Sequence, residues 1–331
     1  MTVLAKAGVG GFLVAIAILC IVVFARRRYR KMSVGMPISV GDAKAQRRFI
    51  DSHKAFLQEF PALQSLLAES FRLSEEKCYP EPQNQQTAGA VEQTDEELAR
   101  EVVLSLERAA FEDFAELLIL AGNGMGIGAK KTLRSLYERL VTAGYIAKNP
   151  AEARIFLANT DIEKGKVLNR AIEAVPELVN KDFTPEEIQN LRDRKKAAED
   201  KKKVDYCPKC KHPETEEAWT RVNLDAMAKK VDDTLFKLYG VCYLSPTLLT
   251  HATPFGLDIR FRNTAAGPDY NARSETNAHD AIWRGHFLML WLLRHQDNYF
   301  GLQLGSQIDA RCSAFSVVWP EDSDAAPSNG R

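Results

Sequence analysis

Apolar residues recur at steps of three and four along most of the chain beyond residue 42, and this spacing limits the fold more than any other feature. Side chains spaced in this way share one face of an α-helix, which has to bury that face against other helices. The longest example keeps one apolar face for about five turns. Its members are Leu98, Val102, Leu106, Ala110, Phe114, Leu117 and Leu118. We therefore predict an all-α helical bundle, with a strand-like pattern only at Ala314–Trp319.

Two capping-box patterns mark predicted helix starts, because a Thr stands three residues before a Glu in each. They are Thr94–Glu97 and Thr184–Glu187. The segment from Asp42 to about Arg72 is also predicted to be helical. An interruption is expected near Pro61, because proline lacks the N–H that a helix interior uses. A last helix is predicted over Glu275–Asn298, and its apolar run Phe287–Leu293 is too short to cross a bilayer and therefore typical of a buried core helix.

One stretch, Ala7–Ala25, departs from this amphipathic spacing, since its 19 residues include no charged group. As a helix it would span about 28 Å, close to the hydrocarbon thickness of a bilayer. Five cations follow at once within Arg26–Lys31, whereas a cleavable signal peptide carries its positive charge before the apolar run. We therefore predict a single-pass membrane protein whose bulk is cytoplasmic. Residues 7–25 would lie in the lipid bilayer and Arg26–Lys31 against anionic lipid.

These patterns divide the chain into four predicted parts. Residues 1–31 form the transmembrane anchor and its basic flank, 32–93 a linker with the first helices, 94–300 a cytoplasmic helical domain, and 301–331 a C-terminal tail.

The charge balance bears on possible partners. Basic and acidic residues number 44 each, but the first 31 residues hold six of the cations and no acid. The rest of the chain is therefore acidic, which argues against general nucleic-acid binding. Six cysteines in 331 residues are too few for a scaffold held together by disulfides.

The most specific local motif is Cys207-Pro208-Lys209-Cys210-Lys211-His212. Two thiolates separated by two residues can hold one tetrahedral zinc ion from a tight turn, and His212 can add a third ligand. We therefore name Cys207, Cys210 and His212 as candidate metal ligands in a small Cys-x-x-Cys loop, with structural zinc as the cofactor. A reduced pair of thiols without a metal explains the same motif, and both interpretations stay open. A redox pair would need a helix N-terminus in a βαβ setting, which the flanking residues do not supply.

Three pieces of sequence carry a family resemblance. They are Gly126–Ala129 leading into Arg134-Ser135-Leu136-Tyr137-Glu138; Tyr145–Ala153 followed by Phe156-Leu157; and Trp219 ahead of Leu224–Val231, with Tyr239 and a helix closing on His251. Through them the stretch from Leu117 to about Pro254 resembles a family of bacterial helical domains whose function is not established. The resemblance implies a bundle with a shared polar site and no known reaction. Thr247 stands where the family is expected to carry Ser. A looser likeness links the chain to small helical ribonuclease and abortive-infection domains.

Two pairs within this stretch are candidates for chemistry. Arg134 and Glu138 lie one helical turn apart at the border of an apolar stripe, as do Thr247 and His251 in a later helix. We name Arg134, Glu138 and His251 as candidate catalytic residues, because a cation, a carboxylate and an imidazole can together bind and move protons. The plainer interpretation is an ordinary intrahelical ion pair for the first two and a core histidine for the third.

Two further motifs resemble parts of phosphate-binding sites. Gly122–Gly128 alternates glycine with other residues, but a phosphate-binding loop needs a preceding strand, so a turn between helices is favoured. Arg273 and His279 have a spacing similar to that of helical ribonucleases, which use an Arg and a His against a phosphate. A loop residue next to the start of a helix explains the same pair and is favoured, because the acidic body disfavours an RNA path. Together with the predicted anchor and helical domain, these patterns favour a membrane-anchored cytoplasmic module that binds or senses a ligand. The alternative is a toxin-like or defence-related nuclease that cleaves phosphodiesters, and no pattern decides whether the chain is an enzyme.

Overall fold

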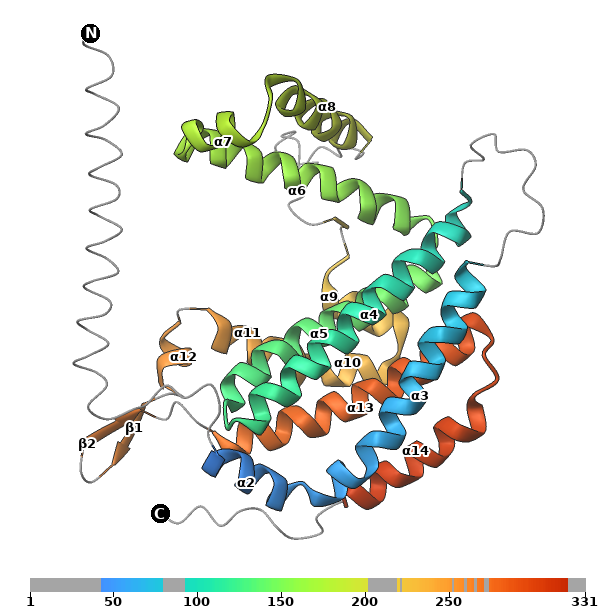
Figure 1. The fold of residues 1–331 in the computed structure, drawn as a ribbon, viewed down its shortest axis with the longest axis vertical. Helices are drawn as coiled ribbons and strands as arrows, with labels where there is room; N and C mark the ends of the chain where they lie inside the picture. The colour runs from blue at the N-terminus through green and yellow to red at the C-terminus, as the bar shows by residue number, and fades with distance from the viewer. Residues whose placement is uncertain are drawn as a thin grey trace, which may run out of the picture. The chain divides into compact units, whose positions relative to one another are not determined.

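Three long helices form the centre of the fold. They are α4 (Asp95–Gly122), α5 (Gly126–Lys148) and α13 (Glu275–Phe300). Each contacts the other two, and Figure 1 shows α13 lying against the α4–α5 pair. The apolar faces predicted from the spacing meet here, since Phe114, Tyr137 and Leu288 are all fully buried. The predicted helical bundle is therefore confirmed.

This computed structural model describes residues 43–79, 93–201, 219–220, 222–251, 253–258, 261–264, 267–270 and 274–320. The elements from Lys44 onward belong to one compact unit. Among the described residues, helices account for nearly all of the regular structure.

Three further helices pack onto this centre. They are α2 (Ala43–Ser52), α3 (Lys54–Cys78) and α14 (Gly305–Val318), and α14 contacts both α3 and α13. The predicted break near Pro61 is wrong, because α3 runs through this residue and buries Phe56 and Leu63 on either side of it. The helix break falls at His53, whose backbone N–H and imidazole Nδ1 both lie 3.0 Å from the carbonyl oxygen of Phe49.

Part of the chain assigned to a C-terminal tail is helical. Helix α14 includes Ala314–Val318, so the strand predicted for Ala314–Trp319 is wrong. Ile308 is fully buried and Trp319 packs on His279 and Phe56, which gives this segment a tertiary reason to be a helix. Alternating apolar residues alone cannot tell a short strand from the end of a packed helix.

The glycine-rich segment between α4 and α5 is a turn between helices, as the sequence favoured. Gly124 adopts a φ of 75°, a left-handed conformation that glycine tolerates best. A Cβ atom on Gly126 would lie 2.0 Å from the carbonyl oxygen of Ser274. This absence of a side chain lets the start of α5 approach the start of α13.

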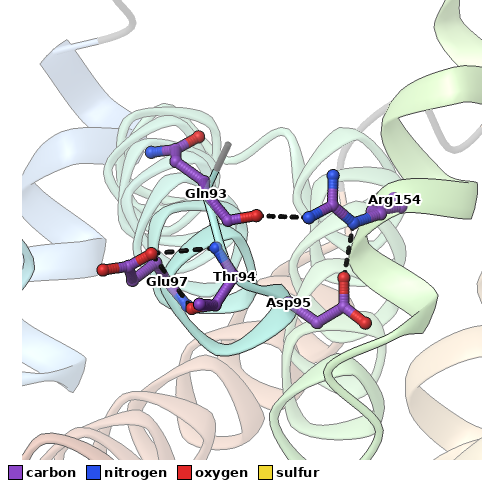
Figure 2. A network of polar contacts seen from close by, with 5 residues as sticks. All are labelled: Gln93, Thr94, Asp95, Glu97 and Arg154. Carbon is purple, nitrogen blue, oxygen red and sulfur yellow. Dashed lines mark hydrogen bonds and ion pairs between the residues drawn. The ribbon is translucent and has the colours of Figure 1, made fainter. Parts of the chain in front are cut away.

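The capping box predicted for α4 is present. The backbone N–H of Glu97 donates to the Thr94 hydroxyl at 3.2 Å, and the backbone N–H of Thr94 donates to the Glu97 carboxylate at 2.9 Å. Figure 2 shows that Arg154 joins this helix start to α6. Its guanidinium donates to the Asp95 carboxylate at 2.5 Å and to the carbonyl of Gln93. One local signal therefore also fixes a contact between helices.

Three helices make an arm with a small core of its own. They are α6 (Glu152–Ala174), α7 (Pro176–Asp182) and α8 (Pro185–Lys201). The second predicted capping box is confirmed at the start of α8, where Thr184 and Glu187 exchange two hydrogen bonds. Leu168, Val179 and Ile188 form the buried cluster of the arm.

The chain then returns to α5 through a series of short elements. They are α9 (Leu224–Val231), α10 (Asp233–Tyr239), the π-helix η1 (Gly240–Leu244), α11 (Ser245–Thr250) and α12 (Pro254–Asp258). Strands β1 (Phe261–Thr264) and β2 (Gly267–Tyr270) follow as an antiparallel pair in which Phe261 faces Tyr270. The sequence analysis did not predict this hairpin, because glycine and proline in β2 hide any alternating pattern.

The prediction of a single-pass membrane protein, and the localisation that depended on it, is contradicted. None of the helices within the described ranges combines the length and the apolar character needed to cross a bilayer. The longest of them, α4 with 28 residues, carries charged side chains from Asp95 to Glu116. The predicted anchor Ala7–Ala25 and the cations Arg26–Lys31 lie outside the described residues.

A buried polar network connects α3, α4 and α13. Glu107 is fully buried, and its carboxylate binds Nδ1 of His295 at 2.6 Å and the amide of Gln296 at 3.1 Å. Ser70 donates in turn to the Gln296 side-chain oxygen at 2.5 Å. The network provides hydrogen-bond partners for the Glu107 carboxylate inside the core. These partners are needed because burying a carboxylate without them greatly destabilises the folded state.

Candidate functional site

Arg134 and Thr247 meet across the interface between α5 and α11. The Nε–H of Arg134 donates to the Thr247 hydroxyl at 2.9 Å, although the two residues are 113 positions apart. The same hydroxyl donates to the carbonyl oxygen of Tyr243 at 2.6 Å, so its lone pair is directed to the guanidinium. Two of the pieces that carried the family resemblance therefore come together in space.

Tyr243 covers the Arg134 guanidinium. The centre of the guanidinium lies 4.9 Å from the centroid of the Tyr243 ring, a cation–π distance. A second guanidinium nitrogen donates to the Tyr243 hydroxyl at 3.4 Å. Tyr243 is itself stacked on Tyr239, with ring centroids 5.4 Å apart. Two residues from outside α5, Thr247 and Tyr243, thus fix the orientation of Arg134.

Glu138 holds the open side of Arg134 more loosely. The two charged groups form the predicted ion pair, but their closest atoms are 3.6 Å apart, beyond a normal hydrogen bond. The Glu138 side chain is 46% exposed and that of Arg134 is 26% exposed. Because the carboxylate is solvated and distant, the pair contributes little to stability.

A second polar group lies one turn earlier on α5. Lys130 and Arg284 both pair with the Asp280 carboxylate, Arg284 through two bonds of 2.7 and 2.8 Å. Burial, with the nearby Arg284, lowers the pKa of Lys130 to about 8. Burial raises the pKa of the fully buried Cys242 thiol to about 11, so this cysteine stays protonated.

The π-helix η1 connects these two groups. A π-helical turn is rare and is often found at functional sites. Here it places Cys242 in the core while the next residue, Tyr243, covers Arg134. We name the whole set the α5 seam. Its members are Lys130, Arg134 and Glu138 of α5, Cys242, Tyr243 and Thr247 of η1 and α11, and Asp280 and Arg284 of α13.

His251 ends α11 and is exposed. Its backbone N–H binds the carbonyl of Thr247, but the structure shows no hydrogen bond from its imidazole to another described residue. The structure therefore brings together Arg134, Glu138 and Thr247 without joining His251 to them. The catalytic roles proposed for Arg134, Glu138 and His251 stay predictions.

The predicted zinc ligands Cys207, Cys210 and His212 lie outside the described residues, and so does Arg273. In the part of the chain that the structure describes, no cluster of three or more His, Cys, Asp or Glu side chains is placed to hold a metal ion. The zinc site therefore stays a prediction, as does the pairing of Arg273 with His279.

Sequence reasoning missed one polar pair altogether. His279 was considered, but its partner is His53, 226 positions away, with 3.2 Å between the two imidazole nitrogens. No local pattern around His53 in the sequence identifies His279 as its partner.

Residues 100–267, just over half of the chain, match a family of unknown function, DUF5677. The chain belongs to the DUF5677 family. No curated protein and no solved structure matches the chain. The predicted resemblance to an uncharacterised helical family is thus confirmed, and the DUF5677 match extends beyond the predicted limits of 117 and 254 on both sides.

The DUF5677 segment contains most of the α5 seam. Its α5, η1 and α11 members lie within residues 100–267, whereas Asp280 and Arg284 come from α13, outside the match. The seam is therefore built mainly from DUF5677 residues and completed by a helix that follows them.

Proposed function

We propose that this DUF5677 chain is a helical binding module that holds the anionic group of a small ligand, a phosphate or a carboxylate, at Arg134. The observation that carries the proposal is the contrast around this guanidinium. Groups from η1 and α11 orient it at 2.9 to 4.9 Å, while its carboxylate partner Glu138 lies 3.6 Å away on the solvent side.

The chemistry of arginine supports this function. A guanidinium offers five N–H donors in one plane, and Thr247 and Tyr243 use the Nε edge and one terminal nitrogen. The remaining donors suit the paired oxygens of a phosphate or carboxylate, which bind arginine in a bidentate manner. Because the side chain is already oriented, less conformational entropy is lost when an anion binds.

The surrounding charges favour the same class of ligand. Lys130 and Arg284 share the single carboxylate of Asp280, which leaves one positive charge in excess one turn from Arg134. A positive potential in a partly buried site attracts anions and weakens as salt is added.

Two substitutions with opposite expected effects test the proposal. Titration calorimetry with inorganic phosphate, citrate and adenosine monophosphate would measure binding to the full chain at low salt. Arg134→Gln removes the donor and should weaken binding of the preferred anion at least tenfold. Glu138→Gln removes the competing carboxylate and should strengthen it.

Arg72→Gln is a matched control, because Arg72 and Glu76 form an exposed pair with the same spacing on another helix. This variant and His251→Ala should bind like the unchanged protein, since neither side chain is needed to hold the anion. The proposal would be wrong if Arg134→Gln and Arg72→Gln had the same affinity, or if no anion bound the unchanged chain.

A further inference from the structure

Two cavities open onto the His53–His279 pair, away from the α5 seam. One has a volume of about 450 Å³ and the other about 400 Å³, and both are lined by Ser52, His53 and His279. These volumes lie in the range of small-molecule sites, about 300–1,000 Å³. The lining residues come from α2, α3, α13 and the end of α14, with Ala121 and Gly124 added from the end of α4 and the turn after it. Most of them lie outside the DUF5677 match.

Hydrogen bonds set the proton positions of the two histidines. Nδ1 of His53 lies 3.0 Å from the carbonyl oxygen of Phe49, which can only accept, so this nitrogen carries the proton. In the neutral ring, Nε2 of His53 therefore accepts a hydrogen bond. The donor is the Nδ1–H of His279, 3.2 Å away. Burial lowers the pKa of His53, which favours this neutral form at pH 7. A buried residue thus fixes the ring and tautomer of the exposed His279.

Aromatic side chains make up much of the larger cavity. Phe56, Trp283 and Trp319 line it together with the two imidazoles. Trp319 meets His279 edge to face with 5.2 Å between centroids, and it lies 5.9 Å from Phe56. Aromatic faces of this kind favour flat rings, and a nucleic-acid base stacks on an aromatic side chain in the same way.

We propose that the cavity between α3, α13 and the end of α14 binds a neutral, planar heteroaromatic ring of the nucleobase class. Phe56, Trp283 and Trp319 provide apolar contact for its faces. The oriented imidazole of His279 provides a polar group for its edge. Ligand sites of this composition are mainly apolar, with a few fixed polar groups that determine orientation.

Two other ligand classes fit the same residues less well. A metal ion would need further ligands, and no cluster of three suitable side chains is present among the described residues. A cationic ligand would meet no carboxylate among the described residues that line the larger cavity, and the Arg284 guanidinium already lies 4.7 Å from the Trp283 ring. A neutral ring avoids both problems.

Ligand-detected NMR on the full chain tests this proposal with adenine, cytosine and nicotinamide as planar probes and cyclohexanol as a saturated ring. At least one planar probe should bind with a Kd below about 1 mM, while cyclohexanol should bind at least tenfold more weakly. His279→Ala and Trp283→Leu should each weaken the bound probe at least tenfold. Both residues are at least partly exposed, so these variants should remain folded by circular dichroism.

His251→Ala is the control, because it removes an exposed histidine that lines neither cavity. It should leave probe binding unchanged, and so should Arg134→Gln, which separates this site from the anion site. The proposal would be overturned if no planar probe bound, if cyclohexanol bound equally well, or if folded His279→Ala and Trp283→Leu kept full affinity.

Discussion

The indole N–H of Trp319 donates to Nδ1 of His286 across 3.1 Å, and this bond ties the end of α14 to the middle of α13. Because Nδ1 accepts, the neutral imidazole carries its proton on Nε2. That nitrogen is buried and has no hydrogen-bond partner among the described residues. Burial lowers the pKa of His286 to about 4, against an ordinary value of 6.5.

This pair predicts a loss of stability in weak acid. Between pH 6.5 and pH 4 the unfolded chain binds a proton at His286 and the folded chain does not, so lowering the pH favours unfolding. The full effect is about 3 kcal/mol and is complete near pH 4. His286→Gln keeps an acceptor for Trp319 but does not titrate. Urea unfolding at several pH values should therefore show a shallower acid loss for this variant, whereas exposed His251→Gln should follow the unchanged protein.

The Glu107 network predicts coupled losses of stability. Gln296→Leu leaves the Ser70 hydroxyl and one oxygen of the buried Glu107 carboxylate without a partner, which should cost about 3 kcal/mol. Ser70→Ala should cost about 1 kcal/mol. In the double variant the loss should be smaller than the sum, because the Ser70 bond is already gone. Additive losses in urea unfolding would show that the network does not act as a unit.

The start of α5 predicts opposite effects for two nearby glycines. Gly126→Ala would place a Cβ atom 2.0 Å from the Ser274 carbonyl oxygen and 2.6 Å from the Ala278 nitrogen. Because both atoms belong to the backbone, the loss should be about 3 kcal/mol. Gly128→Ala would meet the Leu120 side chain at 3.5 Å and Cβ of Met125 at 3.8 Å, both ordinary contacts. It should therefore be neutral or stabilise the helix by up to about 1 kcal/mol. Thermal unfolding of both variants would decide, and equal melting temperatures would contradict the close approach of α5 and α13.

Asp280 should matter far more than an exposed carboxylate in a similar pair. Asp280→Asn leaves Lys130 and Arg284, with side chains only 10% and 16% exposed, as neighbouring unpaired cations. The expected loss is about 3 kcal/mol. Asp309→Asn breaks an ion pair with Arg294 whose carboxylate is 67% exposed, so it should cost less than about 1 kcal/mol. A similar loss for both variants in urea unfolding would argue against a special role for Asp280.

The helices could be predicted because their signals are local. Apolar spacing placed α4 and α13, and the Thr94 and Thr184 capping boxes marked where α4 and α8 begin. The break predicted near Pro61 does not occur, because burial on both sides of this residue outweighs the local preference of proline, and the break at His53 was missed. The β1–β2 hairpin lacked an alternating pattern and was missed for that reason.

Only part of the candidate site could be predicted from the sequence, because only some of its contacts lie within one helix. Arg134 and Glu138 share one helix, so their spacing predicted their pairing. The contact of Arg134 with Thr247, and that of His53 with His279, depend on how distant helices pack, which no local pattern contains. Glu107 did leave a signal in the sequence, since it lies four residues after Val103 and three before Ala110, at the spacing of an apolar helix face.

Helix α13 begins after the DUF5677 match has ended at residue 267, yet it covers both α4 and α5 and carries the counter-ion of Lys130. A fragment cut at the limits of the match would therefore expose the faces of α4 and α5 that α13 covers and leave the Lys130 ammonium without its carboxylate partner. The segment that matches the DUF5677 family is therefore shorter than the helical core of which it is part. Any transplant or deletion of this module has to move α13 along with it.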